Sequence, residues 1–309
     1  MARILIAGCG YVGTALGVAL AGRGDTAFAL RRRAALLPRG LLPVAADLSD
    51  PRTLTALPGP FDAVVYAAAP ECGDEAAYER VYVRGLANLL DAIARAHRTA
   101  PPQVVLLSST SVYGQTAGEW VDETSPTEPA DFRGCLVLRG EETLDAAGVP
   151  GVVLRLGGIY GPGRTSLLDA VRERRARLAP GPPRFTNRIH RDDVVGTLLH
   201  LLAPPPGRPT LEPDRTVWIG VDEEPTDRGD VVRWLARRLG VPEGDLVEND
   251  VGPSTSSAPA CAPAATHRRG RRSDTGKRCS SAKLRASGYR FRFPTFREGY
   301  ADLLGQTRD

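Results

Sequence analysis

Lysine, aromatic side chains and long apolar runs are all scarce in this sequence. No apolar run reaches the roughly 18 residues that a membrane-spanning helix needs, so we expect no membrane span. No basic segment precedes the first apolar run, and we therefore expect no secretory signal peptide. Aromatic residues make up only 6% of the 309 residues, so the core must rely on alanine, valine and leucine. The only lysines are Lys277 and Lys283, which leaves few candidates for lysine-based catalysis.

Paired cysteines and a strongly basic charge are also lacking. The five cysteines are widely spaced and form no CxxC pair, so we expect neither a disulfide framework nor a metal site. This cysteine usage favours a reducing, cytoplasmic location. The net charge of +4 is too weak to predict a nucleic-acid partner. With 42% hydrophobic and 25% charged residues, the composition is that of a folded globular protein.

Strand and helix patterns alternate along the first half of the chain. Apolar runs that predict buried strands lie at residues 2–7, 26–30, 42–46, 62–67, 103–108 and 151–156. Segments with helical spacing lie between them at residues 11–21, 75–97 and 134–147. Strands joined by helices of this length predict an α/β fold with a Rossmann-type, doubly wound parallel sheet and right-handed crossovers.

The alternation loosens after about residue 160. Further helices are expected at residues 166–177, 192–202 and 230–239, with a strand at 216–220. We therefore expect a Rossmann domain over residues 1–160 and a smaller C-terminal substrate lobe over residues 161–309, partly interleaved with the first. Residues 249–281 are rich in Pro, Ser, Ala and Arg without periodicity, which predicts a mobile loop; the alternative is a basic lid over an anionic ligand.

The strongest motif is GCGYVG, which begins at Gly8 directly between the first strand and the first helix. Gly8 permits the tight turn, and Gly10 has no side chain to hold off a pyrophosphate. Gly13 lets the helix approach the strand closely. Tyr11 and Val12 open the helix, whose terminal amides and dipole favour an anion. The motif predicts a dinucleotide site; a glycine-rich turn without a ligand is the alternative.

Arginines occupy the end of the second predicted strand, where a carboxylate would bind the ribose of NAD. Arg31 and Arg32, followed by a third arginine, can pair with a 2′-phosphate, so we expect NADP, with NAD as the alternative. Asp47, followed by Leu48, is placed to contact adenine. Small side chains at other strand ends let the cofactor lie against the backbone. These positions are Ala67, Ala68, Ala69, Ser108, Gly157 and Gly158.

Four motifs together resemble the extended short-chain dehydrogenase/reductases, the NAD-dependent epimerase/dehydratase family. They are GCGYVG at 8–13, SSTSVYG at 108–114, LRLGGIYGPGR at 154–164 and NRIHRDD at 187–193. The tail GKRCSSAKLRASGYRF at 276–291 is similar to the C-terminal signature of an atypical subgroup. The resemblance implies an NAD(P)-dependent oxidoreductase, either a carbonyl reductase or an epimerase-like enzyme. We expect a small-molecule substrate, neither a nucleic-acid nor a membrane partner, and a monomer or homodimer.

The resemblance also implies a serine that holds the substrate oxygen and a YxxxK motif that transfers the proton. Ser109 matches the serine, but residues 115–145 contain neither tyrosine nor lysine, so the YxxxK motif is missing. Many family members carry a glutamate four residues after the lysine. Glu141 and Glu142 both fit that place, which leaves the register of the missing pair open.

Few residues are left to perform the proton transfer. Tyr113 lies in the VYG run, where the family's tyrosine is not the general acid. Arg133 flanks the vacant position and can stabilise an oxyanion, although arginine cannot donate a proton near neutral pH. Tyr160, Asn187 and His190 are candidate substrate contacts, with packing or interface hydrogen bonds as the alternative. A catalytically silent NADP-binding sensor or partner protein is therefore the second hypothesis.

Overall fold

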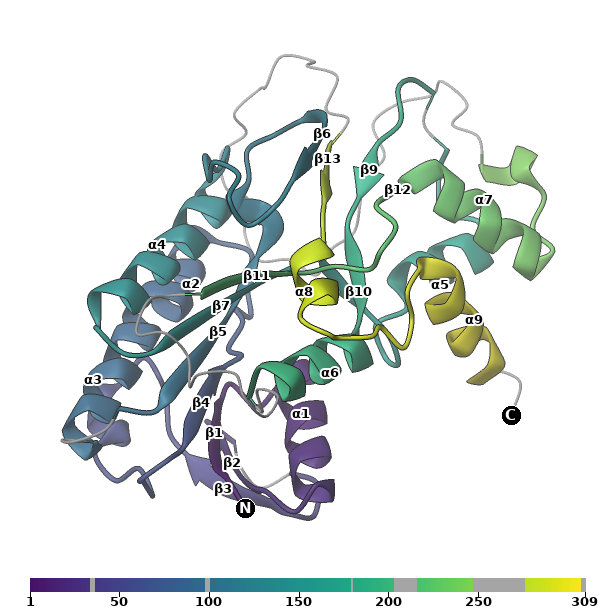
Figure 1. Ribbon diagram of the computed structural model, residues 1–309. Helices are drawn as coiled ribbons and strands as arrows, with labels where there is room; N and C mark the ends of the chain where they lie inside the picture. The colour runs from purple at the N-terminus through teal and green to yellow at the C-terminus, as the bar shows by residue number, and fades with distance from the viewer. Residues whose placement is uncertain (34–36, 98–100, 179, 203–215, 247–275, 307–309) are drawn as a thin grey trace.

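A seven-stranded parallel sheet runs through the centre of the molecule (Figure 1). The computed structural model describes residues 1–33, 37–97, 101–178, 180–202, 216–246 and 276–306. The strand order is β3-β2-β1-β4-β5-β7-β11. The bounds are β1 (Arg3–Ala7), β2 (Thr26–Arg31), β3 (Leu41–Ala45), β4 (Ala63–Tyr66), β5 (Gln103–Ser109), β7 (Gly151–Leu156) and β11 (Thr216–Gly220). The chain builds the sheet outward from β1 to β3 and then continues on the other side of β1, from β4 to β11. This arrangement confirms the predicted doubly wound topology.

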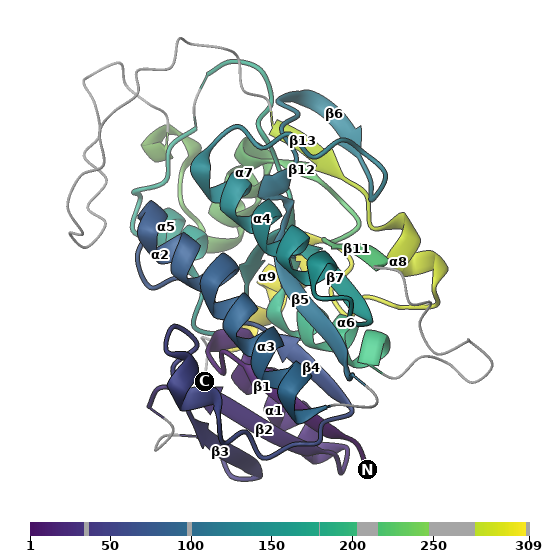
Figure 2. The same cartoon turned by 90° about the vertical axis from the view of Figure 1, so that its left-hand side faces the viewer.

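Helices cover both faces of this sheet. In the view of Figure 2, α3 (Leu86–Ala96) and α4 (Phe132–Ala146) lie across one face, while α1 (Tyr11–Gly22) and α6 (Arg191–Leu202) pack on the other. Successive residues of β1 alternate between the two layers, because Ile4 and Ile6 pack under α1 whereas Leu5 packs under α3. No helix of the described chain is long and apolar enough to cross a membrane.

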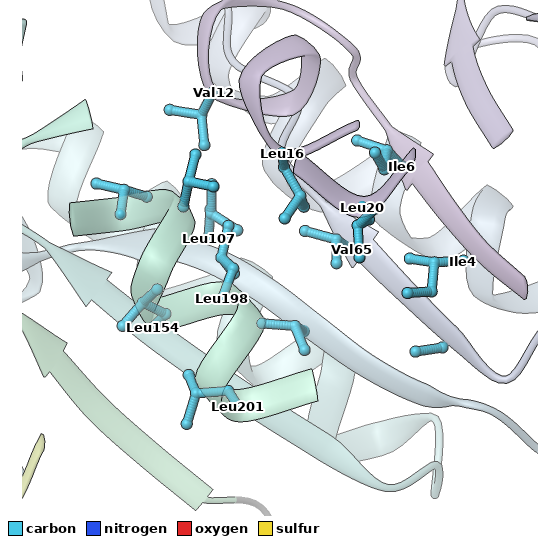
Figure 3. Close-up of a cluster of buried hydrophobic side chains, with 14 of the residues drawn as sticks. Ile4, Ile6, Val12, Leu16, Leu20, Val65, Leu107, Leu154, Leu198 and Leu201 are labelled. Carbon is cyan, nitrogen blue, oxygen red and sulfur yellow. The ribbon is translucent and has the colours of Figure 1, made fainter. Parts of the chain in front are cut away.

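The layer between the sheet, α1 and α6 is built from aliphatic side chains (Figure 3). Leu16 and Leu20 of α1 face Leu198 and Leu201 of α6, and all four lie above the strands. The strand residues beneath them include Ile4, Ile6, Val65, Leu107 and Leu154. Burying each such side chain contributes about 1.5–3 kcal/mol, so this layer stabilises the sheet edge that carries the glycine loop.

The chain after Tyr160 forms a second group of elements. The helices α5 (Ser166–Arg172), α7 (Arg228–Leu239) and α9 (Phe296–Gln306) share an apolar cluster centred on Phe296. Three two-stranded sheets join the parts: β8 (Gly158–Tyr160) with β10 (Arg188–His190), β9 (Phe185–Thr186) with β12 (Thr226–Asp227), and β6 (Ala117–Val121) with β13 (Gly276–Cys279). Because β11 belongs to the large sheet and α6 packs on α1, the two groups interleave; the boundary at residue 160 itself stays a prediction.

Three sequence expectations need correction. The helix expected over 75–97 is α2 (Glu75–Tyr78), a π-helical segment η3 (Glu79–Gly85) and α3. The helix expected over 166–177 ends at Arg172, and the backbone then turns through Arg174 with φ of 58°. Residues 276–279 are the strand β13 rather than loop, because they pair with β6 far back in the sequence. Residues 249–275 of the predicted loop lie outside the described residues.

Candidate functional site

A cavity of about 950 Å³ lies at the carboxyl ends of β1, β2, β4, β5 and β7. This is the edge where the strand order reverses and where open α/β sheets bind their ligands. Most of the predicted cofactor residues line it. These are Gly8, Gly10, Tyr11, Val12, Arg31, Arg32, Asp47, Leu48, Ala67, Ala68, Ala69, Ser108 and Gly157. Gly13 and Gly158 do not line it.

The glycine loop is shaped by two close approaches and one open position. Gly8 has a φ of +91°, and a Cβ added there would lie 2.3 Å from the backbone nitrogen of Ala68. A Cβ on Gly13 would lie 2.6 Å from the carbonyl oxygen of Gly8. A Cβ on Gly10 would meet nothing within 4 Å, because this residue faces the cavity. Gly8 and Gly13 therefore hold β1, α1 and β4 together, and Gly10 leaves the surface open to a ligand.

The N-terminus of α1 is neither capped by a side chain nor neutralised by an acidic residue in its first turn. Gly10 is the N-cap and supplies no side-chain hydrogen bond, and the first turn of the helix contains no acidic residue. The first amides of an α-helix have no intrahelical acceptor and carry the positive end of the helix dipole. Together with the open face at Gly10, these features fit the phosphates of a dinucleotide.

Positive charge dominates the cavity wall. Five arginines line the cavity against two carboxylates; the arginines are Arg31, Arg32, Arg33, Arg80 and Arg164, and the acids are Asp47 and Glu71. Arg32 is ion-paired with Glu71, but both side chains are more than half exposed, so the pair is weak. The other four arginines form no ion pair with any described residue. The wall therefore favours an anionic ligand.

The two serines at the end of β5 have opposite hydrogen-bonding roles. Ser108 donates to Oε1 of Glu141 at 2.5 Å, so its proton is engaged inside the protein. Ser109 instead accepts a hydrogen bond from the backbone N–H of Ser111 at 3.1 Å, which leaves its own proton for a ligand. Both serines line the cavity. Ser109 is therefore the serine with a proton free to donate into the cavity, and its contact with a substrate oxygen stays a prediction.

Tyr113 belongs to a buried network behind the cavity. Arg155 binds both carboxylate oxygens of Glu141, at 3.0 and 2.7 Å, and donates to the Tyr113 hydroxyl at 2.9 Å. That hydroxyl in turn donates to the carbonyl oxygen of Asp122 at 2.8 Å. Burial raises the pKa of Tyr113 to about 12, although Arg155 opposes the shift. Tyr113 does not line the cavity, and its hydroxyl is already satisfied, so its position does not support a catalytic role.

Arg133 and Asn187 also lie outside the lining. The exposed Arg133 guanidinium donates to the carbonyl oxygen of Gly73 at 3.3 Å, next to lining residues of the same loop. Asn187 donates to the carbonyl oxygen of Lys277 at 2.9 Å and accepts from the N–H of Cys279 at 2.7 Å. Asn187 therefore holds β13 in place, and the predicted substrate contacts of both residues stay predictions.

Tyr160 and His190 pack together away from the cavity. Their rings are 5.3 Å apart, and Tyr160 also stacks on Tyr300 at 4.7 Å. His190 lies against Phe293, and its Nδ1 accepts a hydrogen bond from the N–H of Asp192 at 3.2 Å. Burial lowers the pKa of His190, which favours the neutral ring. Both residues have the surroundings of packed core side chains, and their substrate contacts stay predictions.

No sequence pattern pointed to several of the lining residues. Arg80 and Tyr82 reach the cavity from η3, the π-helical segment, and Arg164 follows β8. A regular helical stripe does not reveal where a helix widens into a π turn, although such turns often occur at functional sites. The sequence did not reveal the Glu141–Arg155 ion pair either, because Glu141 lies on α4 and Arg155 lies on β7.

Comparison with known proteins agrees with this geometry. The NAD dependent epimerase/dehydratase family model matches residues 4–199. "Protein YeeZ" of Escherichia coli (strain K12) is 31% identical over 221 residues, covering 67% of this chain and 75% of that protein. The dTDP-6-deoxy-L-talose 4-dehydrogenase (NAD(P)(+)) of Kitasatospora kifunensis is 34% identical over 171 residues, covering 52% of this chain and 53% of that protein.

A solved structure extends the likeness to the whole chain. A protein from Methylobacillus flagellatus, described as an NAD-dependent epimerase/dehydratase, superposes with a TM-score of 0.76. It is 31% identical and covers 100% of this chain and 99% of its own. The family match, the doubly wound sheet and the glycine loop lead to one conclusion: this chain belongs to the NAD-dependent epimerase/dehydratase family.

Proposed function

We propose that this protein is an NADPH-dependent carbonyl reductase of the extended short-chain dehydrogenase/reductase type, acting on a small, anionic carbonyl compound. The observation that carries the proposal is a single cavity that joins the glycine loop, the arginines after β2 and the donor hydroxyl of Ser109. A cytoplasmic location and a monomeric or homodimeric state belong to the same proposal.

The cofactor half of the cavity matches NADP. The amides at the start of α1 bind the pyrophosphate, and Arg31 with its neighbours pairs with the 2′-phosphate. Ala67, Ala68 and Ala69 leave the backbone after β4 open to the ribose and phosphates. When bound, the reduced nicotinamide supplies a hydride. The Kitasatospora relative, whose name gives NAD(P)(+), supports either coenzyme, and the arginines favour NADP.

The substrate half depends on Ser109 and on the register of α4. Of the two candidate glutamates, Glu141 is fully buried and ion-paired, whereas Glu142 is exposed. If Glu141 is the glutamate that follows the lysine in the family's pattern, Arg133 stands at the tyrosine position and Val137 at the lysine position. Arg133 then stabilises negative charge on the substrate but supplies no proton.

The test measures loss of NADPH absorbance with a panel of aldehydes, ketones and nucleotide-linked ketosugars. We expect oxidation above background with at least one member and slower turnover with NADH. No oxidation with any member contradicts the proposal.

A catalytically silent NADP-binding protein is the second candidate. It is favoured by the lack of tyrosine and lysine in residues 115–145. It predicts calorimetric binding of NADPH without turnover of any panel member, so the same two measurements separate the candidates.

A further inference from the structure

Three tyrosines line the cavity, and their hydroxyl groups differ in what they contact. Tyr66 is fully buried, and its hydroxyl donates to the carbonyl oxygen of Val81 at 2.5 Å. Tyr11 lies at the glycine loop, with the Arg164 guanidinium 4.3 Å from its ring centre, and its buried hydroxyl has no hydrogen-bond partner among the described residues. Tyr82 is half-buried, and no described residue forms a hydrogen bond with its hydroxyl. Tyr82 is thus the lining tyrosine whose hydroxyl is not bound to a backbone carbonyl, as that of Tyr66 is, and which does not lie at the glycine loop, as Tyr11 does.

The position of Tyr82 is fixed by close packing of η3 against α4. A Cβ on Gly140 would lie 2.7 Å from the carbonyl oxygen of Tyr82 and 3.4 Å from its Cβ, so only glycine permits this approach. The Tyr82 ring packs with the apolar cluster that contains Val112 and Val137, and it lies 5.6 Å from the ring of Tyr78. Tyr82 therefore reaches the cavity beside the helix that lacks a tyrosine of its own.

We propose that Tyr82 is the phenol that binds the substrate oxygen and supplies its proton. The proposal rests on the carbonyl reductase function above. The carbonyl carbon accepts the hydride, and the electron pair of the breaking C=O π bond moves to oxygen. That oxygen forms a new O–H bond with the Tyr82 proton, and the tyrosinate then takes a proton from water. Ser109 donates the second hydrogen bond to the same oxygen.

The surroundings of Tyr82 suit a proton donor in the reducing direction. Burial, with a smaller contribution from Tyr78, raises the pKa of Tyr82 to about 12. The hydroxyl therefore keeps its proton throughout the neutral range. An alkoxide is a far stronger base than a phenolate, so proton transfer from Tyr82 to the reduced oxygen is downhill. Val137 brings no cation that would lower this pKa, so Tyr82 is poorly suited to act as a base in alcohol oxidation.

The first test compares Tyr82→Phe with Tyr78→Phe in the full-length protein. Both variants remove one hydroxyl from two neighbouring rings, but Tyr78 does not line the cavity. We expect Tyr82→Phe to lower kcat by about 10²-fold or more while NADPH affinity stays unchanged, and Tyr78→Phe to stay within about twofold of wild type. Wild-type kcat in Tyr82→Phe overturns the role of Tyr82 and leaves the reductase function intact.

The second test does not depend on turnover. Tetramethylene sulfoxide presents an S=O oxygen that accepts hydrogen bonds as a carbonyl does but is not reduced by hydride. The protein carries eight tyrosines, and the ¹³Cζ resonance absent from the Tyr82→Phe spectrum identifies Tyr82. We expect this resonance, and not that of Tyr78, to move when the sulfoxide is added to the NADPH-saturated protein.

The two tests separate the two proposals. A sulfoxide-dependent shift at Tyr82 in a protein that oxidises no NADPH supports the Tyr82 contact and overturns the reductase function. An unmoved Tyr82 resonance overturns the contact whether or not the protein is active.

Discussion

Ser108 and Glu141 share a 2.5 Å hydrogen bond that links the cavity wall to a carboxylate with no exposed surface. The bond uses the only proton of Ser108, so this serine can only accept hydrogen bonds from a ligand. Its neighbour Ser109 receives a bond from the backbone and keeps its proton. The buried Glu141–Arg155 pair therefore decides which of the two adjacent hydroxyls keeps a proton that it can donate into the cavity.

We expect Ser109→Ala and Ser108→Ala to have different effects. Loss of the Ser109 hydroxyl removes a substrate hydrogen bond and should lower kcat by roughly 10²-fold with little change in stability. Loss of the Ser108 hydroxyl removes one hydrogen-bond donor from the buried Glu141 carboxylate. This loss should lower the unfolding free energy by about 1–3 kcal/mol. Steady-state kinetics and urea unfolding check the pair. Equal kinetic losses in both variants would contradict the assignment.

Glu141→Gln should destabilise the protein strongly. The substitution leaves Arg155, which is 3% exposed, without its counter-charge, and breaking one side of a buried pair costs about 3–5 kcal/mol. Glu142→Gln is the matched control, because Glu142 is exposed and adjacent, and it should stay within about 0.5 kcal/mol of wild type. Urea unfolding of both variants measures the difference. A Glu142→Gln variant that loses as much stability as Glu141→Gln would show that the ion pair is not the cause.

Local sequence patterns predicted the sheet and many of the residues that line the cavity around the glycine loop. Strands such as β1 are continuous apolar runs because both faces are buried, and Gly8, Gly10 and Gly13 mark the loop that follows β1 by their spacing. Each of these signals lies within a few neighbouring residues, which is why the sequence reveals it.

The features that escaped prediction depend on contacts between distant segments. The strand β13 exists because it pairs with β6 and is held by Asn187, and nothing in its own four residues is typical of a strand. Tyr82 looked like part of an ordinary helical stripe, and only the packing of η3 against Gly140 brings it to the cavity. The role of Glu141 required Arg155 from another strand.

Coenzyme preference should depend on Arg31. Arg31 has no ion pair with a described residue, whereas Arg32 is held by Glu71, so we expect Arg31→Ala to weaken NADPH binding by about 10- to 100-fold and to leave NADH binding unchanged. Calorimetry with both coenzymes measures the change. Glu71→Gln is the complementary variant, because releasing Arg32 should strengthen NADPH binding, most clearly at low salt. Equal loss of NADH affinity in Arg31→Ala would show that the arginine does not recognise the 2′-phosphate.

The buried carboxyl of Asp222 should make the protein less stable as the pH rises. Burial raises the pKa of Asp222 to about 8; Arg188 and a backbone hydrogen bond from Glu224 oppose the shift, and the charges of Glu224 and Asp193 add to it. The folded protein keeps the proton above the unfolded pKa of about 4, where the unfolded chain releases it. The group's stabilisation is therefore complete below about pH 4 and is lost progressively up to about pH 8.

Asp222→Asn isolates this effect, because asparagine resembles the protonated carboxyl and does not ionise. We expect the variant to be more stable than wild type at pH 8 by at least about 1 kcal/mol, since each unit of pKa shift corresponds to about 1.4 kcal/mol. At pH 4 the two proteins should differ by less than about 0.5 kcal/mol, because Asp222 is then protonated in the folded protein and only about half ionised in the unfolded chain. Urea unfolding of both proteins between pH 4 and 8 measures the slopes, and parallel curves would show that Asp222 is ionised in the folded protein, with Arg188 as its counter-charge.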